Sequence, residues 1–135
     1  MAASESRILR LHSRSKSQAL DITQEIQSVV TASGVADGLC VVYVPHTTAA
    51  VFINENADPQ ALSDILAALD RLVPWEAGYA HAEGNAAAHI KATLTGGSQT
   101  IPVHAGRLAL GRWQGVFFAE FDGPRERQCQ VSVIS

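Results

Sequence analysis

The hydrophobic pattern near the start of the chain predicts two extended segments followed by a helix. Residues 6–14 and 17–20 read as extended, and Asp21 followed by Gln24 has the spacing of a capping box at a helix start. Gly34 is typical of the residue that ends a helix. The apolar stripe of this helix consists of Ile22, Ile26, Val29 and Val30.

The middle of the chain predicts two strands and a second helix. The apolar, β-branched run at residues 39–44 indicates a strand that is buried on both faces, and residues 49–54 read as a second strand. Asp58 followed by Pro59 is a typical helix start, and Pro74 is the expected stop. The apolar face of this helix consists of Leu62, Ile65, Leu66, Leu69, Leu72 and Val73.

The second half of the chain predicts one short helix and then strands. A loop over residues 75–85 leads to a helix over residues 86–95, with Asn85 as its cap and Gly96 at its end. Strands are expected within the stretches 98–104, 108–111, 112–122 and 127–135. The turn "DGPR" joins the last two of them. This order predicts an α+β fold with a mainly antiparallel sheet and two to three helices.

Composition and charge narrow the class of protein. The 135 residues are 47% hydrophobic and 17% charged, which predicts one globular domain over residues 1–135. The net charge of −3 argues against a nucleic-acid binder or an anionic-membrane binder, because such proteins need a concentrated basic face. No apolar run approaches the roughly 20 residues that span a bilayer, and the N-terminus lacks the apolar stretch of a signal peptide. We therefore expect a cytoplasmic protein.

Three histidines stand at the ends of predicted elements. His46 follows a predicted strand, His81 lies in the long loop, and His89 lies in the first turns of the third helix. Imidazoles with carboxylates nearby suit zinc or another divalent ion, although the spacing of His81 and His89 is no known ligand motif. The alternative is that each is an ordinary exposed or hydrogen-bonded histidine.

The start of the third helix is a second candidate site. Gly84 and Asn85 precede three alanines, which leave the first backbone N–H groups accessible, as in helix N-termini that bind phosphate. Ordinary capping by Asn85 is the alternative. The phosphate interpretation gains weight if Lys91, Arg125 or the histidines lie beside this helix end.

Glu120 interrupts an apolar strand and therefore needs a partner. A buried carboxylate is costly unless it is paired, hydrogen-bonded or bound to a metal. A role in a site and a salt bridge with Arg112, Arg125 or Arg127 are both open.

Three longer blocks carry a resemblance to one family. "HTTAAVFINENADP", "HAEGNAAAHIKATLTGGSQTIPV" and "LALGRWQGVFFAEFDGPRERQCQV" are similar, in sequence and order, to the signature blocks of the YjbQ-like family, also called secondary thiamine-phosphate synthases. The resemblance covers the chain from residue 6 to residue 135. It implies a barrel-like sheet and a homotrimer, with Trp75 or Trp113 near a subunit contact. It also implies that an aminopyrimidine pyrophosphate and a thiazole phosphate are joined with release of pyrophosphate.

The resemblance also implies a set of site residues. His46, His81 and His89 would hold a divalent ion, Mg²⁺ or Zn²⁺, to neutralise the leaving pyrophosphate, and Glu55 joins them as a catalytic candidate. The candidate substrate-binding residues are Thr47, Thr48, Asn54, Asp58, Glu83, Gly84, Asn85, Lys91, Glu120 and Arg125. Two further classes stay open. One is a metal-dependent phosphoester hydrolase with Glu55 or Glu83 as base, and the other is a protein that binds a phosphorylated metabolite without chemistry.

Overall fold

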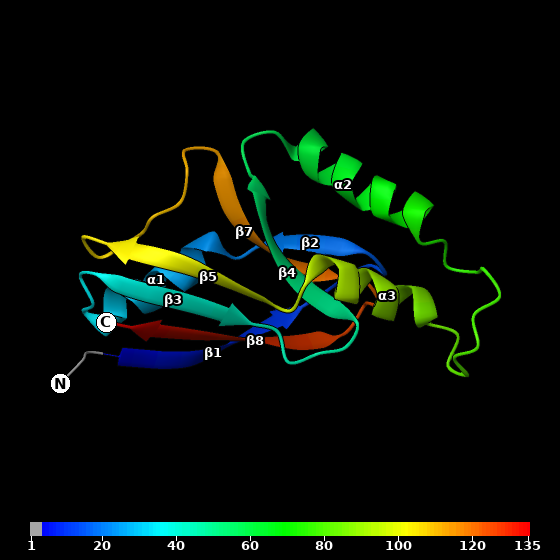
Figure 1. Cartoon of the computed structure of the whole chain (residues 1–135), viewed down its shortest axis with the longest axis horizontal. Coiled ribbons are helices and arrows are strands. Elements are labelled where there is room, and N and C mark those ends of the chain that lie inside the picture. The colour runs from blue at the N-terminus through cyan, green and yellow to red at the C-terminus, as the bar shows by residue number, and fades with distance from the viewer. Residues whose placement is uncertain (1–3) are drawn as a thin grey trace.

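The computed structural model describes residues 4–135 (Figure 1). Its strands are β1 (Ser4–His12), β2 (Gln18–Asp21), β3 (Gly38–Tyr43), β4 (Ala49–Glu55), β5 (Ser98–His104), β6 (Arg107–Leu108), β7 (Gln114–Glu120) and β8 (Glu126–Ile134). Its helices are α1 (Thr23–Ser33), α2 (Pro59–Leu72) and α3 (Ala86–Thr95). The domain predicted over residues 1–135 includes residues 1–3, which lie outside this described part.

The strands form two antiparallel sheets. One has the order β1-β8-β3-β5-β6 and the other the order β2-β7-β4. Together the sheets make a strongly curled half-barrel (Figure 1). Across residues 4–135 this confirms the predicted α+β fold, with its mainly antiparallel sheet and its three helices.

Residues 96–97 connect the two sheets just after α3. The Val44 N–H donates to the Gly97 carbonyl at 2.8 Å, and the Val51 N–H donates to the Gly96 carbonyl at 3.1 Å. These bonds hold the segment between β3 and β4 close to α3. The two sequence blocks that contain the histidines are thereby brought to the same end of the molecule.

The main core lies between α1 and the sheets. Ile26 and Val30 of α1 are completely buried, as the helical stripe predicts. The helix begins at Thr23, and its predicted capping box is absent because Asp21 accepts instead from the Thr23 N–H at 3.0 Å and the Thr23 hydroxyl at 2.6 Å. Gly34 ends α1 in the left-handed conformation, as expected.

The prediction that β3 is buried on both faces is wrong. Cys40 and Val42 are completely buried, whereas Leu39 and Tyr43 on the opposite face are 48% and 50% exposed. In the described residues α1 covers only the inner face of this sheet. An apolar run alone does not reveal whether a second layer covers the outer face.

Helices α2 and α3 lie over the three-stranded sheet. Asp58 caps α2 by accepting from the Gln60 N–H at 2.9 Å, with Pro59 in the first turn, as predicted. Helix α3 ends before Gly96 as expected, but Asn85 makes no capping hydrogen bond. Within residues 4–135, no helix has the length and apolar character needed to cross a membrane.

Candidate functional site

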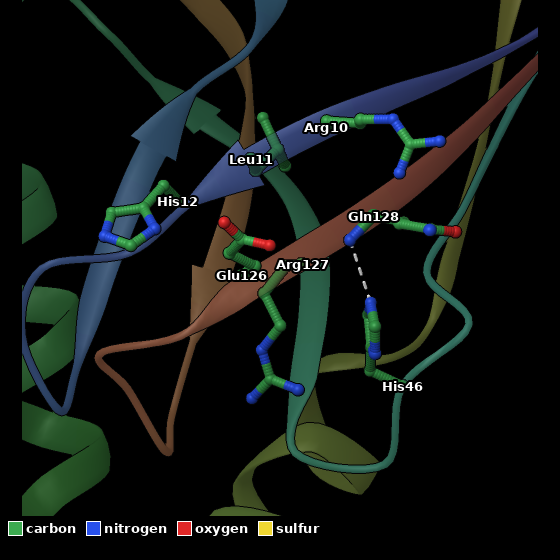
Figure 2. Close-up of a pocket in the computed structure, with 7 residues that line it drawn as sticks. All are labelled: Arg10, Leu11, His12, His46, Glu126, Arg127 and Gln128. Carbon is green, nitrogen blue, oxygen red and sulfur yellow. Dashed lines mark hydrogen bonds between the residues drawn. The ribbon is translucent and has the colours of Figure 1, made fainter.

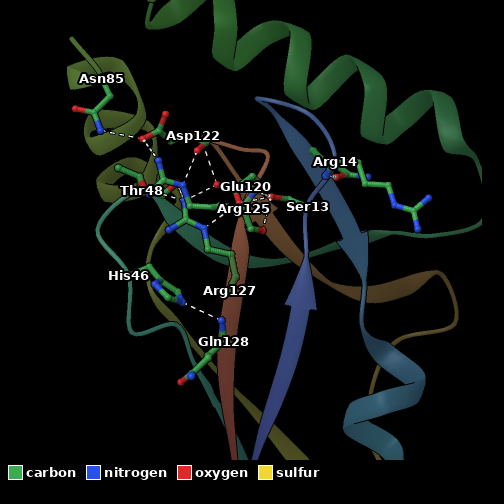
Figure 3. A network of polar contacts seen from close by, with 11 residues as sticks. Ser13, Arg14, His46, Thr48, Asn85, Glu120, Asp122, Arg125, Arg127 and Gln128 are labelled. Carbon is green, nitrogen blue, oxygen red and sulfur yellow. Dashed lines mark hydrogen bonds and ion pairs between the residues drawn. The ribbon is translucent and has the colours of Figure 1, made fainter. Parts of the chain in front are cut away.

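A buried ion pair joins β7 and β8 to neighbouring segments (Figure 3). Arg127 Nε donates to one oxygen of Glu120 at 2.8 Å, and Arg127 Nη2 donates to the other oxygen. The same Nη2 donates to the Thr48 hydroxyl at 2.8 Å. Glu120 also accepts from the Ser13 hydroxyl at 2.6 Å and from the Asp122 N–H at 3.0 Å. The carboxylate thereby links β7 to Ser13 and to β8, and Arg127 extends the link to Thr48.

These contacts decide the charge state of Glu120. Burial acts to raise the pKa of this carboxyl, but the hydrogen bonds from Arg127 and Ser13 outweigh burial and lower the pKa below its usual range. Glu120 is ionised and completely buried, so its side chain has no exposed surface for a ligand to touch. Of the two interpretations left open by the sequence, the salt bridge is the observed one, with Arg127.

His46 is held by a backbone donor. The Gln128 N–H donates to His46 Nε2 at 2.9 Å (Figure 2). Burial, followed by the positive charge of Arg127, lowers the pKa of His46. The neutral ring therefore carries its proton on Nδ1, which is a hydrogen-bond donor near neutral pH.

One open cavity of about 380 Å³ gathers many of the predicted site residues, and we call it the histidine cavity. Its walls come from the loop that follows β3, from the segment around the start of α3, and from the turn between β7 and β8. The predicted residues that it brings together are His46, Thr47, Thr48, His81, Glu83, Asn85, His89 and Arg125. Their positions in the chain span 80 residues, and only the curled sheet makes them neighbours.

His81 and His89 lie edge to face, with ring centroids 4.9 Å apart and an interplanar angle of 78°. Across residues 4–135, however, no three His, Cys, Asp or Glu side chains are placed so that they could hold a metal ion. The predicted metal-binding centre of His46, His81 and His89 is therefore wrong for this geometry. The metal-dependent hydrolase that the sequence left open lacks a metal site among residues 4–135 for the same reason.

Asn85 links α3 to the β7–β8 turn instead of capping the helix. Its Nδ2 donates to Asp122 at 2.8 Å, and Arg125 Nη2 contacts the same carboxylate oxygen at 3.0 Å (Figure 3). Asn85 Oδ1 is buried and has no partner among the described residues. With Asn85 turned to Asp122, the first turn of α3 has no side-chain cap.

Three predicted site residues lie elsewhere, at the far end of β4. Ala49 pairs with Glu120 near the histidine cavity, whereas Glu55 pairs with Gln114 six residues further along the strand. At about 3.3 Å per residue, Glu55 lies about 20 Å from that end. There Glu55 accepts from the N–H of Asp58, the residue that caps α2. Asn54 neighbours Glu55 and accepts from its N–H at 2.8 Å.

Lys91 and Gly84 are also outside the histidine cavity. Lys91 is buried and pairs with Asp70 of α2. Two residues turn an α-helix by about 200°, so Lys91 faces away from His89. Gly84 lines a neighbouring pocket with Trp75. The phosphate interpretation therefore keeps Arg125 and the histidines beside the start of α3, but not Lys91.

The sequence interpretation left out Ser13, Asp122 and Gln128, and it named Arg127 only as a possible partner of Glu120. A buried carboxylate calls for a cation, which was a usable signal for Arg127. Ser13 lies 107 positions from Glu120, and Gln128 acts through its backbone N–H. Neither contact has a sequence signature.

Comparison with known proteins identifies the family of this chain. Residues 7–135 match the family model described as UPF0047 protein YjbQ-like. The chain belongs to the YjbQ-like UPF0047 family. A Methanocaldococcus jannaschii UPF0047 protein is 49% identical over 93% of this chain and 91% of its own length. The Bacillus subtilis UPF0047 protein YugU is 43% identical over 93% of this chain and 96% of its own length.

Two solved structures share the fold. An uncharacterised YjbQ/UPF0047 protein from Clostridium acetobutylicum has a TM-score of 0.93 at 49% identity, covering 94% of this chain and 98% of that one. A YbjQ-like protein of unknown function from Sulfolobus solfataricus has a TM-score of 0.97 at 30% identity, covering 100% and 99%.

These comparisons correct the predicted activity. The relatives are named only as UPF0047 or YjbQ-like proteins, and the two structures belong to proteins described as uncharacterised or of unknown function. The predictions of a thiamine-phosphate synthase, of a transferase and of a role in thiamine biosynthesis are therefore wrong. Family membership is established, but it brings no activity with it.

Proposed function

We propose that the histidine cavity binds a small phosphorylated ligand. The observation that carries the proposal is the convergence of Arg125, the three histidines and the start of α3 on one open cavity. Arg125 supplies a guanidinium, and His46 supplies a neutral N–H donor. The uncapped first turn of α3 adds backbone donors and the positive end of the helix dipole.

The carboxylates around the cavity are compatible with an anion. Asp122 is already matched by Arg125 and by the Asn85 amide, while the charge of Arg127 is matched by Glu120. Glu83 is exposed, and its charge is solvated by water. Arg125 shares its charge with Asp122, so it acts on a ligand mainly through its hydrogen-bond donors, and Glu83 is the main repulsive charge.

Phosphate binding should respond in opposite directions to these two side chains. We expect wild type to bind inorganic phosphate in a calorimetric titration, and Arg125→Met to weaken binding about tenfold, because a charge-assisted hydrogen bond is lost. Glu83→Gln should strengthen binding by roughly twofold to threefold, since a nearby like charge is removed. Arg107→Met is the control for net charge, because Arg107 lies on β6 at the far edge of the five-stranded sheet.

No heat at millimolar phosphate with wild type, or an Arg107→Met loss equal to that of Arg125→Met, would contradict the proposal. The binding of a divalent ion, Mg²⁺ or Zn²⁺, together with a ligand that supplies further oxygens stays a prediction, so each titration is repeated with each ion.

We also propose the cytoplasmic location that the sequence led us to expect. Its support is that Cys40 and Cys129 are both free thiols.

We also propose that the chain forms a homotrimer. The outer face of the five-stranded sheet exposes Ile8, Leu39, Tyr43 and Ile134, each at about half of its surface. Trp113 is 56% exposed just before β7, at a separate place on the chain. In a cyclic trimer each contact joins two different surface patches. The outer face of the five-stranded sheet and the surface at Trp113 are two such patches. Trp75 is the weaker candidate, because it packs against the smaller core and under Lys16.

Light scattering at micromolar concentration should give three times the chain mass of 14.4 kDa. Tyr43→Arg should reduce that mass to one chain, because it places a charge within an apolar contact. The matched change Arg107→Met should leave the trimer intact. A monomeric wild type would defeat this proposal.

A further inference from the structure

A second cavity of about 410 Å³ adjoins the histidine cavity (Figure 2). It lies where β1 and β8 pair near His12 and Glu126, and we call it the β1–β8 cavity. His46 and Arg127 line both cavities, so the two hollows meet at these residues. A ligand held at one can extend past His46 into the other.

The polar side chains of the β1–β8 cavity come as cross-strand neighbours. Arg10 is paired with Gln128, and His12 is paired with Glu126. Arg10 and Gln128 extend in the same direction from their two strands (Figure 2). Within residues 4–135 of a single chain, the side chains of Arg10 and His12 make no hydrogen bond or ion pair, so in the single chain their donors are available to a ligand.

The charges of this cavity nearly cancel. Arg10 is opposed by Glu126, and Arg127 is neutralised by Glu120. A second anionic group would therefore gain little here. Donors on Arg10, acceptors on Glu126 and an amide that offers both on Gln128 match hydroxyl groups, which also donate and accept.

The aromatic content separates two kinds of organic group. Nucleobases and other flat rings are held largely by stacking on aromatic side chains. No Trp, Tyr or Phe lines the β1–β8 cavity in the described part of the chain, and the rings that do line it are the small imidazoles of His12 and His46, the second of which is held by the Gln128 N–H. The walls are thus suited to a hydroxylated chain or sugar more than to a base or an apolar group.

We propose that the two cavities form one site for a sugar phosphate. Its phosphate lies in the histidine cavity and its hydroxyl groups lie in the β1–β8 cavity, with His46 between them. This inference rests on the proposed phosphate site. It adds the class of the organic group and assigns Arg10 and Gln128 to its recognition.

Calorimetric titrations with inorganic phosphate, ribose 5-phosphate and phenyl phosphate test the inference. We expect wild type to bind ribose 5-phosphate at least tenfold more tightly than either of the other two. Arg10→Met should remove most of this preference while changing the affinity for inorganic phosphate by less than twofold. Arg125→Met should weaken all three ligands, and Arg107→Met should weaken none.

The outcomes separate this inference from the proposal beneath it. Equal affinities of wild type for ribose 5-phosphate and inorganic phosphate, or equally tight phenyl phosphate, would overturn the sugar assignment alone. So would an Arg10→Met variant that loses affinity for inorganic phosphate and ribose 5-phosphate by the same factor. Binding of none of the three ligands would overturn the phosphate site and the sugar assignment together.

Discussion

Replacing Arg127 with methionine is expected to lower the free energy of unfolding by about 3 to 5 kcal/mol, the range for removing one partner of a buried ion pair. The substitution leaves Glu120 completely buried, with the Ser13 hydroxyl and one backbone N–H as its remaining donors. It also removes the donor to Thr48 beside the histidine cavity. Urea denaturation of wild type and variant at pH 7 measures the difference.

A double variant separates the cost of the unpaired charge from the cost of lost packing. Arg127→Met combined with Glu120→Leu removes both charges, so it should recover a large part of the lost free energy. Arg107→Met serves as the surface control and should stay within about 0.5 kcal/mol of wild type. A loss below about 1 kcal/mol for Arg127→Met alone would show that Glu120 finds water or another partner.

The destabilisation by Arg127→Met should also depend on pH. In wild type the pKa of Glu120 is lowered, so its contribution to stability is complete above the unfolded pKa of about 4.3 and is lost as pH falls through the lower folded value. In the variant, burial acts without the arginine and favours the protonated acid. The difference between the two proteins should therefore shrink at acid pH. An unchanged difference from pH 7 to about pH 4 would argue against Glu120 as the cause.

Gly123→Ala is the second substitution with a large expected effect, a loss of about 3 kcal/mol from overpacking. A Cβ at this position would lie 2.4 Å from the Ser15 carbonyl oxygen, 2.7 Å from Ser13 Oγ and 2.9 Å from Glu120 Cγ. The first contact is with backbone, and the other two are with side chains of the buried network. Ser13 and Glu120 cannot move apart without breaking the hydrogen bonds that join them to each other and to Arg125.

Gly97→Ala is the matched control for this change. Its Cβ would meet only the Val44 carbonyl oxygen, at the ordinary contact distance of 3.8 Å. Thermal unfolding of both variants should therefore show a much larger drop in Tm for Gly123→Ala. If the two variants melt together, the turn between β7 and β8 is free to shift, and the close packing at Gly123 is not required for stability.

Local rules in the sequence determined most of the secondary structure. The Asp58–Pro59 start of α2, the left-handed Gly34 after α1 and the end of α3 at Gly96 follow from capping and backbone conformation, which depend on residues within a few positions. Alternation and β-branched runs determined the strands and the antiparallel α+β class. The same local rules erred where another part of the chain intervenes, as at Asn85, which turns to Asp122 instead of capping α3.

Only the tertiary structure decided which polar residues meet. His46, His81, His89 and Arg125 share a cavity because the sheets curl and because residues 96–97 tie the two sheets beside α3. Glu55 stands nine positions from His46 in the sequence, yet an extended strand carries it to the opposite end of β4. Sequence separation measures distance along the chain, whereas a site depends on where strands and helices end in space. The partners of Glu120 and the availability of Arg10 follow from packing, which no local pattern encodes.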